Sequence, residues 1–254
     1  MTKPIEPVEL TAQQALRYSR QLMLPALDFR GQEALLASSV LLIGMGGLGC
    51  AAAPYIVASG VGNLMLVDDD TIDRSNLQRQ ILYREADIGH SKAEQAAASL
   101  RQLNSEITIQ ALRQRLSAED LAGLVGQYSL VLDCTDNLSS RNAINAACVQ
   151  AKVPLVSGAA IRFEGQLASF SMQGDGACYH CLSQLFGEQQ LTCMEAGILS
   201  PVVGIIGSMQ ALEAVKILAG TGTPLYGKLQ LFDALTGKWQ QFSLNKDPLC
   251  NVCG

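Results

Sequence analysis

The chain has 254 residues, of which 48% are hydrophobic and 16% are charged, a composition that provides for a sizeable core and excludes a disordered protein. Its net charge of −5 argues against a basic nucleic-acid-binding surface, so no nucleic acid is expected as a partner. The opening stretch MTKPIEPVEL has no apolar segment typical of a signal peptide, and we expect a cytoplasmic protein whose eight cysteines do not form a disulfide framework.

Strand and helix patterns alternate through the first part of the chain. Short apolar runs that end at glycine or aspartate indicate buried strands, and longer runs with apolar residues on one face indicate helices. In chain order, the predicted elements are a helix over 11–30, a strand over 40–43, a helix over 48–59, a strand over 64–67, a helix over 91–103 with Ser91-x-x-Glu94 as a capping box, strands over 107–112 and 130–132, a helix over 141–150 and a strand over 153–157. This alternation predicts an α/β fold with a Rossmann-like, doubly wound, mostly parallel sheet.

The pattern changes after residue 160. Strands over 165–172, 228–232 and 239–244 predict an antiparallel continuation of the sheet, with a long helix over 202–218 between them. The long uncharged run before Glu213 includes Pro201 and several glycines, so we interpret it as a buried loop and helix and expect no membrane partner. We expect a single domain over 1–254, made of a nucleotide-binding half at 1–160 and a second half at 161–254.

The loop after the first predicted strand has the spacing of a dinucleotide-binding motif. Gly44 allows the tight turn, Gly46 lets a phosphate approach the backbone, and Gly49 lets the helix pack on the strand. We expect the additional Gly47 to widen the opening beside the phosphates, in front of the free N–H groups of the helix. Asp68, after the next strand, can accept hydrogen bonds from a ribose. The motif indicates adenosine and phosphate as well as NAD, and a glycine-rich turn without a ligand is the simpler alternative.

A set of charged and polar residues favours a triphosphate over NAD. Asn76 and Arg79 are three apart, so a helical turn places them on one face. Lys92 lies in the first turn of the helix predicted over 91–103, where a cation is favourable only if an anion lies in front of the helix. Asp136 follows a strand and is placed to hold Mg²⁺. The alternatives are a solvated Lys92 near a helix end and a purely capping role for Asp136 or Asn137.

Two other classes of function fit the sequence less well than nucleotidyl transfer. A dehydrogenase needs a nicotinamide pocket and a proton donor, but His90 has no evident carboxylate partner and His180 lies inside a cysteine pair. A catalytically silent binding scaffold has no need for Arg79, Lys92 and Asp136 together. Nucleotidyl transfer, in contrast, depends mainly on positioning and on charge stabilisation by such groups.

Two C-x-x-C pairs predict a structural zinc site. Four thiolates, from Cys178, Cys181, Cys250 and Cys253, would close a tetrahedral shell and attach the C-terminus to the loop after residue 172. The alternatives are two redox pairs or four unrelated thiols. The remaining cysteines are assigned separately: Cys50 and Cys148 to the core, Cys134 to the neighbourhood of the crevice, and Cys193 to a polar, glycine-bounded segment where it is either a nucleophile or an ordinary loop thiol.

Several stretches together carry a resemblance to a known family. The sequences RYSRQ, GMGGLGC, SNLQRQIL and LDCTDN, with the two C-x-x-C pairs, resemble the MoeB/ThiF family, relatives of the ubiquitin-activating enzymes, over nearly the whole chain. The stretches LVSGAAIRFEGQ and CLSQLFGEQQLTCMEAGI are more similar to the molybdopterin-synthase branch of the family than to its thiamine-pathway branch.

The resemblance implies an ATP-dependent nucleotidyltransferase. In this family the C-terminal glycine carboxylate of a small β-grasp sulfur-carrier protein, which ends in Gly-Gly, attacks the α-phosphate of Mg-ATP and displaces pyrophosphate. Sulfur from a separate donor later displaces AMP to give a thiocarboxylate. The resemblance therefore implies a carrier-binding and zinc-binding second half, and a carrier of molybdopterin synthase as the substrate, with a thiamine-pathway carrier as the alternative.

The resemblance also implies roles for individual residues. Arg20 would act as an arginine finger that reaches into the site of the partner in a homodimer, although by itself it looks like a surface arginine. Cys193 matches a family position whose necessity differs between branches. The implied nucleotide-binding residues are Gly44, Gly46, Gly47, Asp68, Ser75, Asn76, Leu77, Gln78, Arg79, Lys92, Asp136 (with Mg²⁺) and Asn137, and the implied zinc ligands are the four cysteines of the two pairs.

Overall fold

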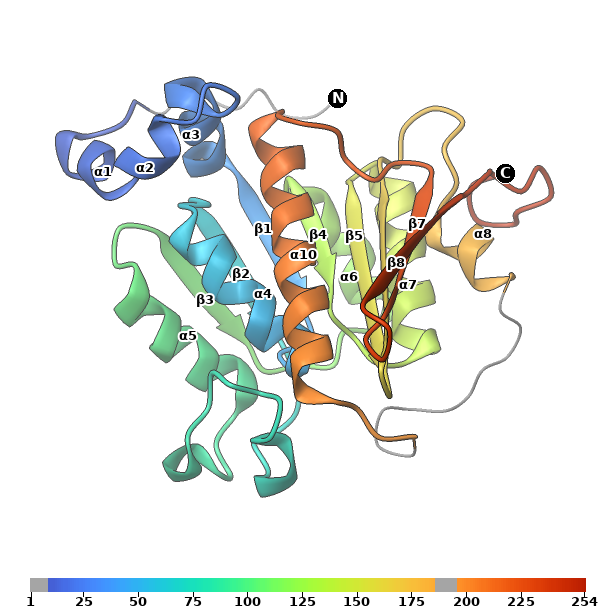
Figure 1. Ribbon diagram of the computed structural model, residues 1–254, viewed down its shortest axis with the longest axis horizontal. Coiled ribbons are helices and arrows are strands. Elements are labelled where there is room, and N and C mark those ends of the chain that lie inside the picture. The colour runs from blue at the N-terminus through green and yellow to red at the C-terminus, as the bar shows by residue number, and fades with distance from the viewer. Residues whose placement is uncertain (1–8, 186–195) are drawn as a thin grey trace.

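A single twisted sheet forms the centre of the computed structural model, which describes residues 9–185 and 196–254 (Figure 1). The strand order is β3-β2-β1-β4-β5-β6-β7-β8. The first five strands in this order are parallel, and β6, β7 and β8 continue the sheet in antiparallel pairs, which confirms the predicted fold class. The strands are β1 (Ser39–Ile43), β2 (Asn63–Val67), β3 (Thr108–Leu112), β4 (Leu130–Asp133), β5 (Leu155–Ile161), β6 (Glu164–Phe170), β7 (Lys228–Asp233) and β8 (Lys238–Ser243).

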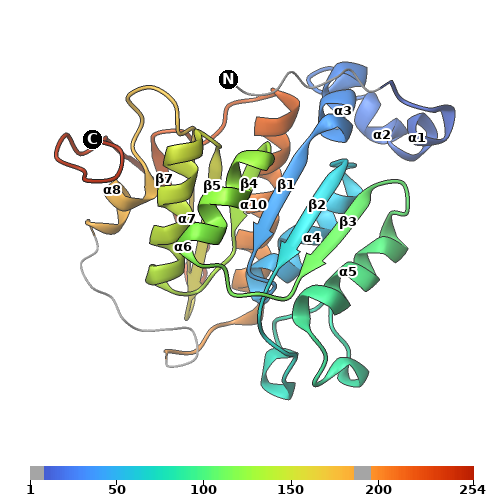
Figure 2. The ribbon, with the colours of Figure 1, turned by 180° about the vertical axis from the view of Figure 1, so that it is seen from behind.

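Helices cover both faces of the parallel part of the sheet. The face seen in Figure 1 carries α4 (Gly47–Ala58), α5 (Lys92–Leu103) and α10 (Ser200–Ala219), and the face seen in Figure 2 carries α6 (Ala118–Leu124) and α7 (Leu138–Ala151). The sequence of β1 is apolar without interruption because both of its faces are buried. Val40 and Leu42 pack into the core under α4, whereas Leu41 and Ile43 pack into the core under α7.

The topology places three loops at one edge of the sheet. Strands β1, β2 and β4 are neighbours and parallel, so the loops that follow them meet beyond their carboxyl ends. The strand order reverses between β1 and β4, and ligands of doubly wound sheets bind at such a switch point. The glycine loop, the acidic residues after β2 and the LDCTDN stretch after β4 are therefore brought together by the fold.

The predicted helix over 11–30 is wrong, because this segment forms short separate helices. They are α1 (Ala12–Arg17) and α2 (Ser19–Leu22), followed after a turn by α3 (Asp28–Ala37). Pro25 disfavours helical geometry at the residue before it, which accounts for the interruption ahead of α3. Tyr18, between α1 and α2, is only 2% exposed, and its hydroxyl accepts a hydrogen bond from Asn104 Nδ2 at 3.0 Å.

Other element boundaries differ from the predicted ones by a few residues. Strand β5 runs beyond the predicted residue 157 to Ile161 and turns directly into β6 through Arg162, which has a positive φ of 54°. The predictions omitted α6 and α8 (Tyr179–Ser183), which are too short to show a clear helical period. Only half of the predicted capping box of α5 forms: Ser91 Oγ accepts from the backbone N–H of Glu94 at 3.4 Å, but among the described residues the Glu94 side chain accepts no return hydrogen bond from the Ser91 N–H.

Helix α10 is long and apolar enough to span a membrane. It nevertheless packs within the protein, against α4, α3 and β5. A Cβ atom at Gly207 would lie 2.5 Å from the backbone oxygen of Leu48, so the two helices approach at backbone distance. The predicted buried helix is therefore a core element of the fold.

Candidate active site

A cavity of about 430 Å³ lies at the carboxyl ends of the parallel strands. Its volume is in the range of cofactor and nucleotide sites. Of the residues predicted to bind nucleotide, nine line it: Gly44, Gly46, Gly47, Asp68, Asn76, Arg79, Lys92, Asp136 and Asn137.

The glycine loop is shaped by close backbone contacts. Gly44 has a φ of 97°, and a Cβ atom there would lie 2.7 Å from the backbone oxygen of Cys134. A Cβ at Gly49 would lie 2.0 Å from the Gly44 oxygen. Gly47 also has a packing role that was not predicted, because a Cβ there would meet Val203 of α10 at 3.1 Å. Gly47 thus allows α10 to approach the first turn of α4 as well as lining the cavity.

Asp68 connects the end of β2 to the glycine loop. Its Oδ2 accepts from the backbone N–H of Met45 at 2.6 Å, and its Oδ1 accepts from that of Asp70 at 2.9 Å. Burial raises the pKa of Asp68, and these two N–H groups act in the opposite direction. Each carboxylate oxygen has a second lone pair, so the fixed carboxylate can also accept from a ribose hydroxyl.

Lys92 is not a solvated lysine. Its side chain is 7% exposed, and its Nζ forms an ion pair with Asp70 Oδ2 at 2.8 Å. The Asp70 carboxylate is thus the anion that a cation at the N-terminus of α5 requires. The sequence patterns assign no role to this residue.

The segment after β2 presents two of its predicted residues to the cavity. Asn76 ends the 3₁₀ helix η1 (Arg74–Asn76), and its Oδ1 accepts from the N–H of Asp73 at 3.1 Å. Arg79 Nη1 donates to the backbone oxygen of Ser75 at 3.2 Å, which directs its guanidinium along the same wall. Three other residues of the predicted set do not line the cavity: Ser75, Leu77 and Gln78.

Two of the polar residues that follow β4, Asp136 and Asn137, have different roles. Asn137 is the N-cap of α7, and its Oδ1 accepts from the N–H of Ser140 at 2.9 Å. Asp136 is exposed, lines the cavity and forms no hydrogen bond with residues of the described ranges. A carboxylate at this edge that accepts no hydrogen bond from the described residues fits a divalent cation, whose ligands are oxygens.

The cavity wall also contains residues that were not predicted. Gln80 is 3% exposed, and its Oε1 accepts no hydrogen bond from the part of the chain that the structure describes. In the sequence, only the position of Gln80 within the motif SNLQRQ could have indicated that it belongs to the site. The other unpredicted polar residues of the wall include Gln114, Arg115, Arg141, Glu164, Gln166 and Tyr179, which come from the loop after β3, from α7, from β6 and from α8.

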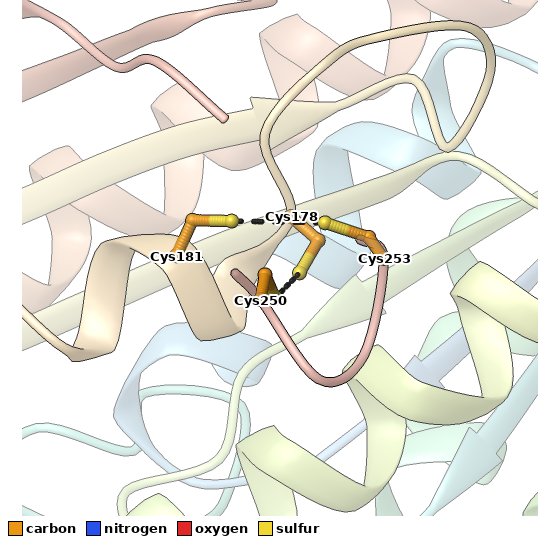
Figure 3. A group of neighbouring side chains, drawn as sticks. All are labelled: Cys178, Cys181, Cys250 and Cys253. Atoms are coloured by element: carbon orange, nitrogen blue, oxygen red, sulfur yellow. Dashed lines mark hydrogen bonds between the residues drawn. The ribbon is translucent and has the colours of Figure 1, made fainter. Parts of the chain in front are cut away.

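The four cysteines of the C-x-x-C pairs converge at one place (Figure 3). The Sγ atoms of Cys178 and Cys250 are 3.9 Å apart, those of Cys181 and Cys253 are 3.6 Å apart, and all four lie within 4.8 Å of one another. A tetrahedral ZnS₄ site with Zn–S bonds of about 2.3 Å has sulfur–sulfur edges of about 3.8 Å. The donor set therefore fits a zinc ion.

The surroundings of the cluster favour a metal ligand role. Asn145 Nδ2 and the backbone N–H of Asp247 donate to the sulfurs of Cys178 and Cys181, both at 3.5 Å. Burial opposes ionisation of Cys250, but N–H groups of Cys253 and of the residue before it outweigh burial and lower the pKa of Cys250 to about 7. The Cys250 thiolate is therefore accessible near neutral pH, whereas burial, the largest cause in each case, raises the pKa values of Cys178 and Cys253.

Comparison with known proteins identifies the family. The sequence model of the ThiF family matches residues 18–252. The chain belongs to the ThiF family. This confirms the resemblance seen in the sequence motifs.

Relatives of this ThiF-family chain match nearly its full length. It is 52% identical to the molybdopterin-synthase adenylyltransferase of Escherichia coli (strain K12), over 97% of this chain and 99% of that protein. It is 46% identical to the sulfur carrier protein ThiS adenylyltransferase of the same organism, over 94% of this chain and 95% of that one. The crystal structure of E. coli MccB with ATP shares the fold, with a TM-score of 0.79, 24% identity, and coverage of 89% of this chain and 68% of that chain.

Arg20 is another predicted residue of the ThiF-family site that does not line the cavity of this chain. Arg20 is exposed on α2, which lies beside α3 at the end of the sheet where β1 begins (Figure 1). It does not line the cavity, so it fits a role there only from another copy. Cys193 lies outside the described residues.

Proposed function

We propose that this chain transfers AMP from ATP to the C-terminal glycine carboxylate of a small β-grasp sulfur carrier of the molybdopterin-synthase type. The observation that carries the proposal is that the glycine loop, Arg79, Lys92 and Asp136 line one cavity. The 52% identity to a molybdopterin-synthase adenylyltransferase over nearly the whole chain supports the same assignment.

The cavity suggests how the reaction proceeds. The N–H groups at the start of α4 face the phosphates and Asp68 accepts from the ribose, while Asn76, Arg79 and Lys92 surround the triphosphate. A carrier carboxylate oxygen bonds to the α-phosphorus, and the bond from that phosphorus to the bridging oxygen of the β-phosphate breaks. Pyrophosphate leaves with the negative charge that the two cations stabilise. A separate sulfur donor then displaces AMP from the acyl-adenylate.

Two metal ions complete the proposal. Asp136 would hold Mg²⁺, which supplies charge neutralisation at the phosphates when bound. The four clustered cysteines would hold a structural zinc ion, since four protein ligands leave no open position. The reduced thiols that this requires, and the burial of α10 within the fold, support a cytoplasmic location.

Two alternatives differ in what they require of the cavity. A thiamine-pathway carrier would use the same chemistry, and the 46% identity to a ThiS adenylyltransferase keeps this substrate as the second candidate. A dehydrogenase would need a proton donor beside a nicotinamide, but neither histidine lines the cavity. His90 Nδ1 instead lies 3.2 Å from the backbone oxygen of Asp87.

ATP–pyrophosphate exchange tests the proposed function. We expect exchange only when a carrier ending in Gly-Gly is present, and faster with a molybdopterin-synthase carrier than with a thiamine-pathway carrier. Faster exchange with the thiamine-pathway carrier would select the alternative substrate. Absence of exchange with every carrier, together with tight binding of NADH, would contradict adenylation.

Replacement of Asp136 by alanine is expected to slow adenylation about 100-fold at fixed Mg²⁺, because a metal-binding carboxylate is lost at the developing charge. The fold should be unaffected, since Asn137 and not Asp136 caps α7. Asn137→Ala is the matched contrast: it should lower stability by about 1 kcal/mol through loss of the cap. Single-turnover rates and melting curves check both, and a wild-type rate for Asp136→Ala would remove that residue from the mechanism.

The arginine finger predicts complementation between inactive variants. Homodimers of Arg20→Ala and of Lys92→Ala should each be nearly inactive. After random re-pairing of protomers, about a quarter of the wild-type activity should return, because half of the dimers then contain one intact site. A mixture that stays inactive although mixed dimers form would mean that Arg20 does not act across the interface.

A further inference from the structure

Asp70 and Lys92 form an ion pair whose two side chains differ in their exposure to solvent. Lys92 Nζ and Asp70 Oδ2 are 2.8 Å apart, but the lysine side chain is 7% exposed whereas the aspartate side chain is 67% exposed. Lys92 is also the first residue of α5, where the helix dipole disfavours a cation. A buried ammonium in this position requires an anion, and Asp70 is the acceptor that Nζ has among the described residues.

The backbone around the pair is tied to the glycine loop. The Lys92 N–H donates to the Asp70 oxygen at 3.0 Å, and the Asp70 N–H donates to Asp68, whose other oxygen holds Met45 of the loop. The Tyr83 hydroxyl is within donating distance of two backbone oxygens, that of Met45 at 2.8 Å and that of Lys92 at 3.2 Å. The ammonium is thus held in the cavity wall by a frame that does not depend on the Asp70 carboxylate.

The difference in exposure determines which partner can leave. If the ion pair separates, the Asp70 carboxylate is hydrated at little cost, whereas the Lys92 ammonium must find another anion within the cavity. Both residues line the cavity, so a triphosphate bound there offers that anion.

We propose that Asp70 is a positioning residue, the counter-ion of Lys92 in the empty site, which releases the ammonium to the nucleotide phosphates. The inference rests on the proposed function. Asp70 competes with the triphosphate for Lys92, so it weakens nucleotide binding while stabilising the empty site. It also takes Lys92 back when pyrophosphate leaves.

Asp70→Asn tests this, with Asp69→Asn as the matched control. Asp69 also lines the cavity, and its replacement removes the same charge without touching the Lys92 ion pair. For Asp70→Asn we expect the dissociation constant of the α,β-methylene analogue of ATP, with Mg²⁺, to fall about 3- to 10-fold relative to Asp69→Asn, which corresponds to about 0.7–1.4 kcal/mol. The empty Asp70→Asn protein should melt roughly 5 °C lower than the control, and saturating nucleotide should remove this difference.

A Lys92→Met background shows whether the effect of Asp70→Asn acts through the ion pair. In that background, Asp70→Asn and Asp69→Asn should bind the analogue equally, because the ion pair is already absent. Equal affinities and equal melting temperatures of the two variants in the wild-type background would overturn the inference and leave the proposed function intact. A wild-type protein that binds no ATP analogue would overturn both.

Discussion

Replacement of Lys92 by alanine is expected to lower the rate of adenylate formation about 1,000-fold. Lys92 supplies a nearly buried cation to the cavity, and removal of one preorganised charge from a protected site costs about 10²–10³ in rate. The protein should still fold, because the carboxylate that loses its partner, Asp70, is mostly exposed and becomes hydrated. Single-turnover formation of the acyl-adenylate at saturating ATP is the measurement, with circular dichroism as the check on the fold.

The control for Lys92→Ala is Lys152→Asn. Lys152 is exposed after α7, at the end of the sheet away from the cavity, and its positive φ of 56° is a conformation that asparagine tolerates. This variant removes the same charge and should keep the wild-type rate. A wild-type rate in Lys92→Ala, or an equal loss in both variants, would show that Lys92 has no specific role at the phosphates.

Replacement of Cys250 by serine is expected to remove the metal and destabilise the protein. Wild-type protein should contain about one zinc ion per chain, and the variant almost none. An ion present at about 1,000 times its dissociation constant stabilises the folded state by about 4 kcal/mol, and in a chain of this size each kcal/mol changes the melting temperature by about 2–4 °C. We therefore expect a fall of roughly 8–16 °C, measured by calorimetry beside metal analysis.

Loss of the zinc ion should also disturb the wall of the cavity. Cys178 and Cys181 hold α8, whose Tyr179 lines the cavity and lies 6.0 Å from the Arg141 guanidinium. Cys193→Ser is the matched control, since it removes one thiol that is not in either C-x-x-C pair and should leave the zinc content unchanged. A Cys250→Ser protein that kept its zinc and its melting temperature would contradict a structural metal site.

The sequence predicted the parts of the fold and site that depend on local patterns. Uninterrupted apolar runs marked β1, β2 and β4, and the residues after each run therefore belong to one edge of a parallel sheet. This is why the glycine loop, Asp68 and Asp136 could be assigned to one crevice. The two C-x-x-C pairs were assigned to one cluster for a chemical reason, because one zinc ion needs four thiolates.

The partners of these residues could not be predicted in the same way. The Lys92 side chain pairs with Asp70, which precedes it by a long loop, and no spacing rule relates the two positions. Likewise, Gly47 faces Val203 of α10, a contact set by how two distant helices pack. Which of Asp136 and Asn137 caps α7 depended on backbone geometry at the end of β4, and both residue types suit a cap.

The remaining wall of the cavity comes from segments without a motif. Arg115 follows β3 and Glu164 begins β6, and each reaches the cavity because the sheet continues past its switch point. Glu164 depends on the turn at Arg162, where a non-glycine residue adopts a positive φ that sequence patterns do not indicate.

The mass of the carrier protein tests the central claim most directly. A molybdopterin-synthase carrier ending in Gly-Gly is incubated with this protein and Mg-ATP, without a sulfur donor, and its C-terminal peptide is analysed by mass spectrometry. We predict that one adenylyl group is added to the terminal glycine and that pyrophosphate is released in equal amount. A carrier that stays unmodified while the protein binds Mg-ATP would contradict the account.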